Sequence, residues 1–151
     1  MPPEESLQIL MVEDDPGHAR LIERNLRRAG VTNDIVVIGD GYEAIDYFFG
    51  DNGQVNGATL TPLLILLDLN LPGLSGLQVL EQLKSDPRTE TIPIIILTTT
   101  EEPQEIRRCY ELGCNVYITK PVKYEQFADA IQKLGLFLSI IKVNRDGHGS
   151  P

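Results

Sequence analysis

The stretch that decides the fold is Leu63-Leu64-Ile65-Leu66-Leu67-Asp68, in which a run of aliphatic residues ends at an aspartate. A run that is apolar at every position is typical of a β-strand buried on both faces, as in the interior of a parallel sheet. The stretch therefore predicts a central strand that carries a carboxylate at its carboxyl end.

Similar runs occur on both sides of this stretch, and amphipathic segments separate them. The expected strands are Gln8–Val12, Asp34–Ile38, Leu63–Asp68, Ile92–Thr98 and Val116–Thr119. The expected helices are His18–Ala29, Tyr42–Phe49, Leu77–Leu83, Gln104–Leu112 and a last one with Phe127, Ile131, Leu134, Leu138 and Ile141 on one stripe. Asp15-Pro16 precedes the first helix as a candidate N-cap and first-turn pair, and Gly113 ends the fourth. The polar segment Gly50–Thr61 predicts a long surface loop. This alternation predicts an α/β fold, an open parallel sheet with right-handed crossovers.

The composition predicts one globular domain and excludes several classes of protein. The chain has 151 residues, with 22 acidic and 13 basic side chains and a formal charge of −9, so a nucleic-acid partner is not expected. The N-terminus lacks the pattern of a signal peptide, and the apolar runs are too short for a membrane helix, so we expect a cytoplasmic protein. Cys109 and Cys114 lack the companions of a zinc site or a disulfide framework, and reduced thiols are expected.

Charged and hydroxyl side chains follow four of the expected strands. They are Glu13, Asp14 and Asp15 after the first strand, Asp68 at the end of the third, Thr98, Thr99 and Thr100 at the end of the fourth, and Lys120 after the fifth. Each alone has an ordinary explanation, such as a helix cap or a solvated side chain. In open α/β sheets, however, ligands bind beyond the carboxyl ends of the strands. The set therefore predicts one site at that edge.

The residue types in this set favour phosphoryl chemistry. Carboxylates brought together repel and need a cation, and an oxygen-rich site suits Mg²⁺. A metal, an ammonium and a hydroxyl together receive a phosphoryl group, so Asp68 becomes a candidate acceptor that forms an aspartyl phosphate. A calcium loop that began at Asp68 would place Pro72 at its fifth position and Val79 where Glu is required. Glycine-rich nucleotide motifs and the zinc-protease motif are absent, and His18 and His148 have no partners in the sequence.

These positions together resemble the receiver domain of two-component response regulators. The resemblance rests on Glu13-Asp14-Asp15, on Asp68 with Pro72-Gly73 and Gly76 after it, on Thr98 and on Lys120-Pro121. It covers residues 7–141 and leaves tails at residues 1–6 and 142–151. It implies a flavodoxin-like receiver fold, with strand order 2-1-3-4-5 and helices on both faces. It further implies a signalling protein, not an ordinary enzyme, that takes a phosphoryl group from a sensor histidine kinase.

The resemblance also implies a role for each site residue. Asp68 is the phosphoacceptor, and the Mg²⁺ ligands are Asp14, Asp68 and the main-chain carbonyl of Asn70, with Glu13 acting through water. Thr98 is the switch hydroxyl, Tyr117 is the aromatic rotamer switch, and Lys120 pairs with the phosphoryl oxygens before a cis bond to Pro121. After phosphorylation, the surface of the fourth helix, fifth strand and fifth helix is expected to change shape.

Two positions depart from the common pattern of the family, and two other functions stay open. Glu13 stands where Asp is commoner, which alters the metal's water shell, and Thr99 is bulkier than the usual Ala, Gly or Ser. An aspartyl-nucleophile phosphatase would need a second acid two residues after Asp68, where this chain has Asn70. A scaffold with the same fold but without phosphorylation is the other alternative.

The last part of the sequence predicts how the protein signals and assembles. No output domain follows the receiver, so we expect a stand-alone regulator that acts through its own surface. The loop Gly50–Thr61, the Ile118-Thr119-Lys120 ending and the apolar extension resemble the regulators partnered with bacterial phytochromes. Leu136 and Ile140 face away from the core stripe, which predicts a homodimer face, with local packing of the C-terminus as the alternative.

Overall fold

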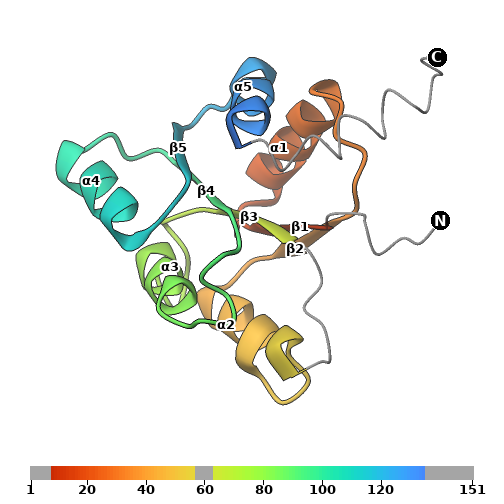
Figure 1. The fold of residues 1–151 in the computed structure, drawn as a ribbon. Coiled ribbons are helices and arrows are strands. Elements are labelled where there is room, and N and C mark those ends of the chain that lie inside the picture. The colour runs from red at the N-terminus through yellow and green to blue at the C-terminus, as the bar shows by residue number, and fades with distance from the viewer. Residues whose placement is uncertain (1–7, 57–62, 135–151) are drawn as a thin grey trace.

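A five-stranded parallel sheet forms the centre of the computed structural model, which describes residues 8–56 and 63–134 (Figure 1). The strands are β1 (Gln8–Val12), β2 (Ile35–Ile38), β3 (Leu63–Leu67), β4 (Ile94–Thr98) and β5 (Val116–Thr119). The helices are α1 (Pro16–Arg28), α2 (Gly41–Phe49), α3 (Gly76–Lys84), α4 (Pro103–Leu112) and α5 (Tyr124–Leu134). The order β2-β1-β3-β4-β5 places β3 in the middle, and the predicted fold class and strand order are confirmed.

Two apolar layers hold the helices against the sheet, one on each face. Successive side chains of a strand point to opposite faces, so β1 contributes Ile9 and Met11 to one layer and Leu10 and Val12 to the other. Helices α1 and α5 cover the first face, where Ile22, Leu26 and Phe127 are among the buried residues. Helices α2, α3 and α4 cover the second face, as Figure 1 shows. The continuous apolar pattern of β3 thus reflects burial on both sides.

Local sequence signals set the ends of the helices. Asp15 caps α1 by accepting hydrogen bonds from the N–H groups of Gly17 and His18, at 2.8 and 3.1 Å. Ser75 and Gln78 form a capping box at the start of α3. Gly113 ends α4 with φ of 111°, a left-handed conformation that favours glycine. The predicted cap pair Asp15-Pro16 and the predicted stop at Gly113 are confirmed.

Several predicted boundaries differ from the observed ones. Strand β4 begins at Ile94 and not at Ile92, because Pro93 has no N–H to donate to the sheet. Helix α1 begins at Pro16, two residues before the predicted start. The predicted loop Gly50–Thr61 contains a short 3-10 turn at Gln54–Asn56. Residues 57–61 of that loop, both tails and the predicted dimer residues Leu136 and Ile140 lie outside the described residues.

Both cysteines are buried thiols. Burial raises the pKa of Cys109 to about 11 and that of Cys114 to about 12, so both thiols are protonated at neutral pH. Within residues 8–56 and 63–134, no helix has the length and apolar character needed to cross a membrane.

Candidate functional site

The carboxyl ends of β1, β3, β4 and β5 bring the predicted site residues to one edge of the sheet. The backbone hydrogen bonds continue beyond the strands and fix these ends: Asp68 N donates to Val12 O at 3.0 Å, and Lys120 N donates to Thr98 O at 2.8 Å. The peptide bond between Lys120 and Pro121 is cis, as predicted. Side chains that are distant in the sequence therefore meet over a rigid scaffold.

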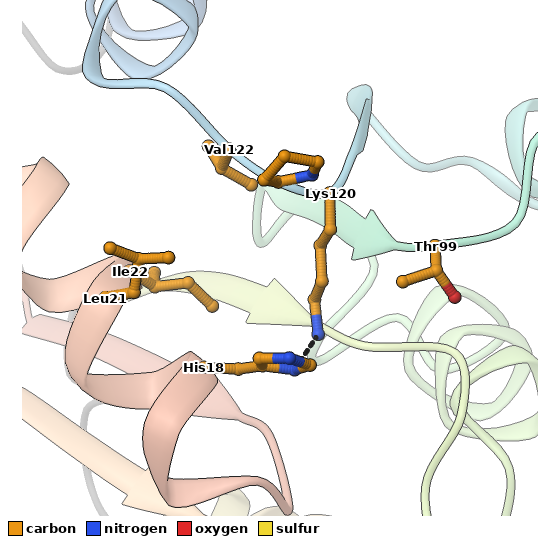
Figure 2. Close-up of a pocket in the computed structure, with 7 residues that line it drawn as sticks. His18, Leu21, Ile22, Thr99, Lys120 and Val122 are labelled. Carbon is orange, nitrogen blue, oxygen red and sulfur yellow. Dashed lines mark hydrogen bonds between the residues drawn. The ribbon is translucent and has the colours of Figure 1, made fainter.

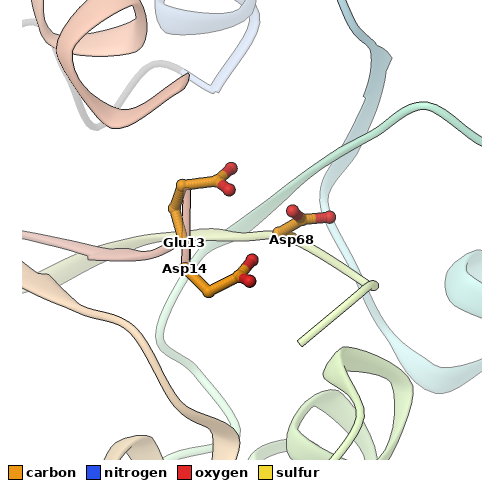
Figure 3. A group of neighbouring side chains, drawn as sticks. All are labelled: Glu13, Asp14 and Asp68. Atoms are coloured by element: carbon orange, nitrogen blue, oxygen red, sulfur yellow. The ribbon is translucent and has the colours of Figure 1, made fainter. Parts of the chain in front are cut away.

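Three carboxylates form the acidic part of this site. Glu13, Asp14 and Asp68 each offer a carboxylate oxygen within 4.8 Å of the others (Figure 3). Glu13 and Asp68 are buried, whereas Asp14 is exposed. Backbone donors hold both buried groups, since Asp15 N donates to Glu13 Oε2 and Asn70 N donates to Asp68 Oδ1, each at 3.1 Å.

Lys120 supplies the opposite charge. Its Nζ lies 2.6 Å from Glu13 Oε1 and 3.1 Å from Asp68 Oδ2, and its side chain is only 8% exposed. Burial by itself would lower the pKa of Lys120, but the hydrogen bond to Glu13 and the charge of Asp68 outweigh it and raise the pKa above its usual range. The pKa of Glu13 is raised, chiefly because the carboxyl group is buried. Lys120 is thus a fixed cation beside Asp68.

The residue set fits a divalent cation. Three carboxylates against one ammonium leave a formal charge of −2 at a cluster that is open to solvent at Asp14. Carboxylate oxygens are hard ligands, and Mg²⁺ binds through one or two of them and keeps several waters. Asp14 and Asp68 could hold such an ion directly.

Thr98 is the last residue of β4, and Tyr117 lies in β5, the strand that leads to Lys120. The Thr98 side chain is fully buried, and its Oγ1 accepts a 3.4 Å hydrogen bond from Thr100 N. Tyr117 donates its hydroxyl proton to Thr100 O at 2.8 Å, and burial raises the pKa of this phenol to about 12. Both predicted switch residues are therefore tied to the same loop residue, Thr100.

An apolar cavity of about 240 Å³ opens beside Lys120, between α1 and the start of the segment after β5 (Figure 2). His18, Leu21, Thr99 and Pro121 are among the residues that line it. His18 Nδ1 lies 3.2 Å from Lys120 Nζ. The sequence interpretation left His18 without a partner, because a contact that spans 102 positions has no local signal.

Asn25 is a second residue that sequence reasoning missed. It lies two helical turns after His18, and its buried Nδ2 donates to Val122 O at 2.6 Å. Helix α1 therefore holds the segment that carries Lys120 and Pro121 at two points. The spacing of seven residues between His18 and Asn25 is a signal that both lie on one helix face.

The family model for the response regulator receiver domain matches residues 9–132. The chain belongs to this family. The receiver domain from Rhodospirillum rubrum is 55% identical to this chain in a match that covers 88% of this chain and 94% of that one, with a TM-score of 0.71. Receiver-domain response regulators are signalling proteins and not classical enzymes.

Two further solved structures link the family to phytochromes. The bacteriophytochrome response regulator AtBRR is 41% identical, with 86% of this chain and 93% of that chain covered and a TM-score of 0.73. The phosphorylated cyanobacterial phytochrome response regulator RcpA is 35% identical, with 93% and 92% covered and a TM-score of 0.68. This chain thus has the size of these receivers, and its structural neighbours include phytochrome-associated regulators.

Proposed function

We propose that this receiver accepts a phosphoryl group on Asp68 from a sensor histidine kinase in the presence of Mg²⁺, and that this kinase is linked to a bacterial phytochrome. The observation that carries the proposal is the position of the Lys120 ammonium between Glu13 and Asp68, within an acidic cluster at the carboxyl edge of the sheet. An unprotonated carboxylate beside a fixed cation is a nucleophile whose product, a charged acyl phosphate, the same cation stabilises.

The transfer step follows from the donors around Asp68. A carboxylate oxygen attacks phosphorus, and a P–O bond forms as the P–N bond to the kinase histidine breaks, with the electron pair leaving on the imidazole. The N–H of Asn70 donates to Asp68 Oδ1. Lys120 Nζ, which donates to Asp68 Oδ2 before transfer, can pair with a phosphoryl oxygen instead. Mg²⁺ on Asp14, Asp68 and the Asn70 carbonyl, with Glu13 acting through water, would neutralise the phosphoryl charge.

The proposed output begins at Thr98. A phosphoryl group adds a charge of about −1.5 to −2 at Asp68 and offers new acceptors to the Thr98 hydroxyl. Movement of Thr98 would disturb Thr100, to which Tyr117 is bonded. The change would therefore reach α4, β5 and α5, which carry these residues or follow them in the chain.

Removal of Mg²⁺ is expected to abolish phosphoryl uptake. Without the cation, the net negative cluster repels an incoming phosphate, and uptake should fall at least about a hundredfold. The measurement is incorporation of labelled phosphate, with and without EDTA, from two donors: acetyl phosphate and a phytochrome-type histidine kinase. Restoration by excess Mg²⁺ is the control.

The two donors separate the parts of the proposal. Equal incorporation in EDTA would contradict the metal-assisted mechanism. Incorporation from acetyl phosphate, but none from the phytochrome-type kinase, would contradict the phytochrome partnership. Release of phosphate from small phosphate esters without any kinase would favour the phosphatase alternative, which Asn70 at the second-acid position disfavours.

We also propose a homodimer through Leu136 and Ile140, which lie beyond the described residues. Changing both residues to Asp is expected to yield monomers, because two charges cannot be buried in an apolar interface without a large penalty. Sedimentation equilibrium measures the mass directly. An unchanged mass for the double variant would contradict this dimer face.

A further inference from the structure

The ammonium of Lys120 meets as many acceptors as it has protons. A lysine ammonium carries three N–H donors and no acceptor. Three acceptors from three elements surround Lys120 Nζ: Glu13 Oε1 at 2.6 Å, Asp68 Oδ2 at 3.1 Å and His18 Nδ1 at 3.2 Å. Because the ammonium can only donate, the contact is a hydrogen bond in the tautomer whose Nδ1 lone pair faces the ammonium and whose ring proton is on Nε2.

His18 Nδ1 is within hydrogen-bonding distance of Lys120 Nζ, but not of the nearby carboxylates of Glu13 and Asp15. Its Nδ1 is 3.8 Å from Glu13 Oε2 and 4.0 Å from Asp15 Oδ2, which is too long for a hydrogen bond. The backbone N–H of His18 is itself bonded to the cap residue Asp15 at 3.1 Å. Figure 2 shows the ring below the tip of the Lys120 side chain, and both residues line the cavity. The His18 side chain is 48% exposed, whereas that of Lys120 is 8% exposed, so the ring lies on the solvent side of the ammonium.

We propose that His18 is a positioning residue for phosphoryl transfer, which holds the Lys120 ammonium over Asp68. The inference rests on the proposed function of Asp68 as phosphoacceptor. When a phosphoryl group reaches Asp68, Lys120 exchanges its bond to Oδ2 for one to a phosphoryl oxygen. His18 takes no part in that exchange, so it keeps the ammonium in place while one of its other partners changes.

Three variants test this role. His18→Leu removes the acceptor and keeps an apolar side chain of moderate size. His18→Asn places Oδ1 at the same branch position as Nδ1, so it restores an acceptor. Arg20→Leu introduces the same leucine at an exposed position of α1 and serves as the matched control.

Two measurements are made on each variant, after circular dichroism has established that it is folded. The first is the NMR signal of the Lys120 side-chain ammonium in the free protein. The second is the affinity for beryllofluoride, a phosphoryl analogue, measured by calorimetry with Mg²⁺. We expect His18→Leu to broaden the lysine signal and to weaken beryllofluoride binding about fivefold, whereas His18→Asn should stay within about twofold of wild type. Arg20→Leu should match wild type in both measurements.

The outcomes separate this inference from the proposed function. Wild-type values for His18→Leu in both measurements would overturn the positioning role. Equal losses in His18→Leu and His18→Asn would also overturn it, since an acceptor at this position would then be irrelevant. If wild type bound no beryllofluoride, the proposed function would fail, and a lysine signal unchanged in His18→Leu would still overturn the contact on its own.

Discussion

Replacing Asp68 with Asn is expected to abolish phosphoryl uptake from both acetyl phosphate and a kinase, while the fold stays intact. An amide has nearly the shape of the carboxylate, and its Oδ1 still accepts the hydrogen bond from Asn70 N. It has no charged oxygen with which to attack phosphorus, however. Loss of a nucleophile reduces such reactions by several orders of magnitude, so uptake should fall at least about a thousandfold.

Intact-protein mass spectrometry measures this loss, and circular dichroism checks the fold. Asp34→Asn is the matched control, because it removes one exposed carboxylate just before β2, at the opposite edge of the sheet. It should take up phosphate at the wild-type rate. A stable phosphate adduct on Asp68→Asn at the wild-type level would show that another residue is the acceptor.

The sequence predicted the elements of this fold well because their signals are local. Buried parallel strands are apolar at every position, as β3 and β4 are, and the caps Asp15 and Gly113 act within a few residues. The predicted start of β4 was wrong because Pro93 is apolar, as a buried strand requires, but cannot donate to the sheet. The strand order had a different origin: right-handed crossovers allow several orders, and the order 2-1-3-4-5 came from the family resemblance.

The contacts in the site also fall into those that the sequence could predict and those that it could not. All strands of a parallel sheet end at the same edge, so residues that directly follow strands, such as Glu13, Asp68 and Lys120, could be expected to meet. His18 and Asn25 are on α1, and their contacts depend on how that helix packs beside the segment after β5. A helical pattern indicates which face is apolar, but not which distant backbone or side chain it will touch.

Gly76 packs tightly against the backbone that carries Asp68. Gly76 is the first residue of α3, and its N–H donates to Leu69 O at 3.0 Å. A Cβ added there would lie 2.1 Å from the carbonyl oxygen of Asp68 and 2.6 Å from Leu69 Cα. Both are backbone atoms, which cannot rotate away as a side chain can. The methyl group therefore forces α3 and the segment after β3 apart.

Gly76→Ala is expected to lower the free energy of unfolding by about 2 to 3 kcal/mol, as overpacking of a tight core does. The higher helix propensity of Ala, about 1 kcal/mol, offsets only part of the strain. Urea unfolding followed by circular dichroism measures the change.

Gly39→Ala is the matched control, because its Cβ would meet Asp14 Cα at 3.6 Å and Glu13 O at 3.7 Å, which are ordinary contacts beside another site carboxylate. It should change the stability by less than about 1 kcal/mol. Equal urea midpoints for the two variants would contradict the close approach of α3 to Asp68. Because the displaced backbone carries the acceptor itself, Gly76→Ala should also slow phosphoryl uptake under conditions in which it remains folded, whereas Gly39→Ala should not.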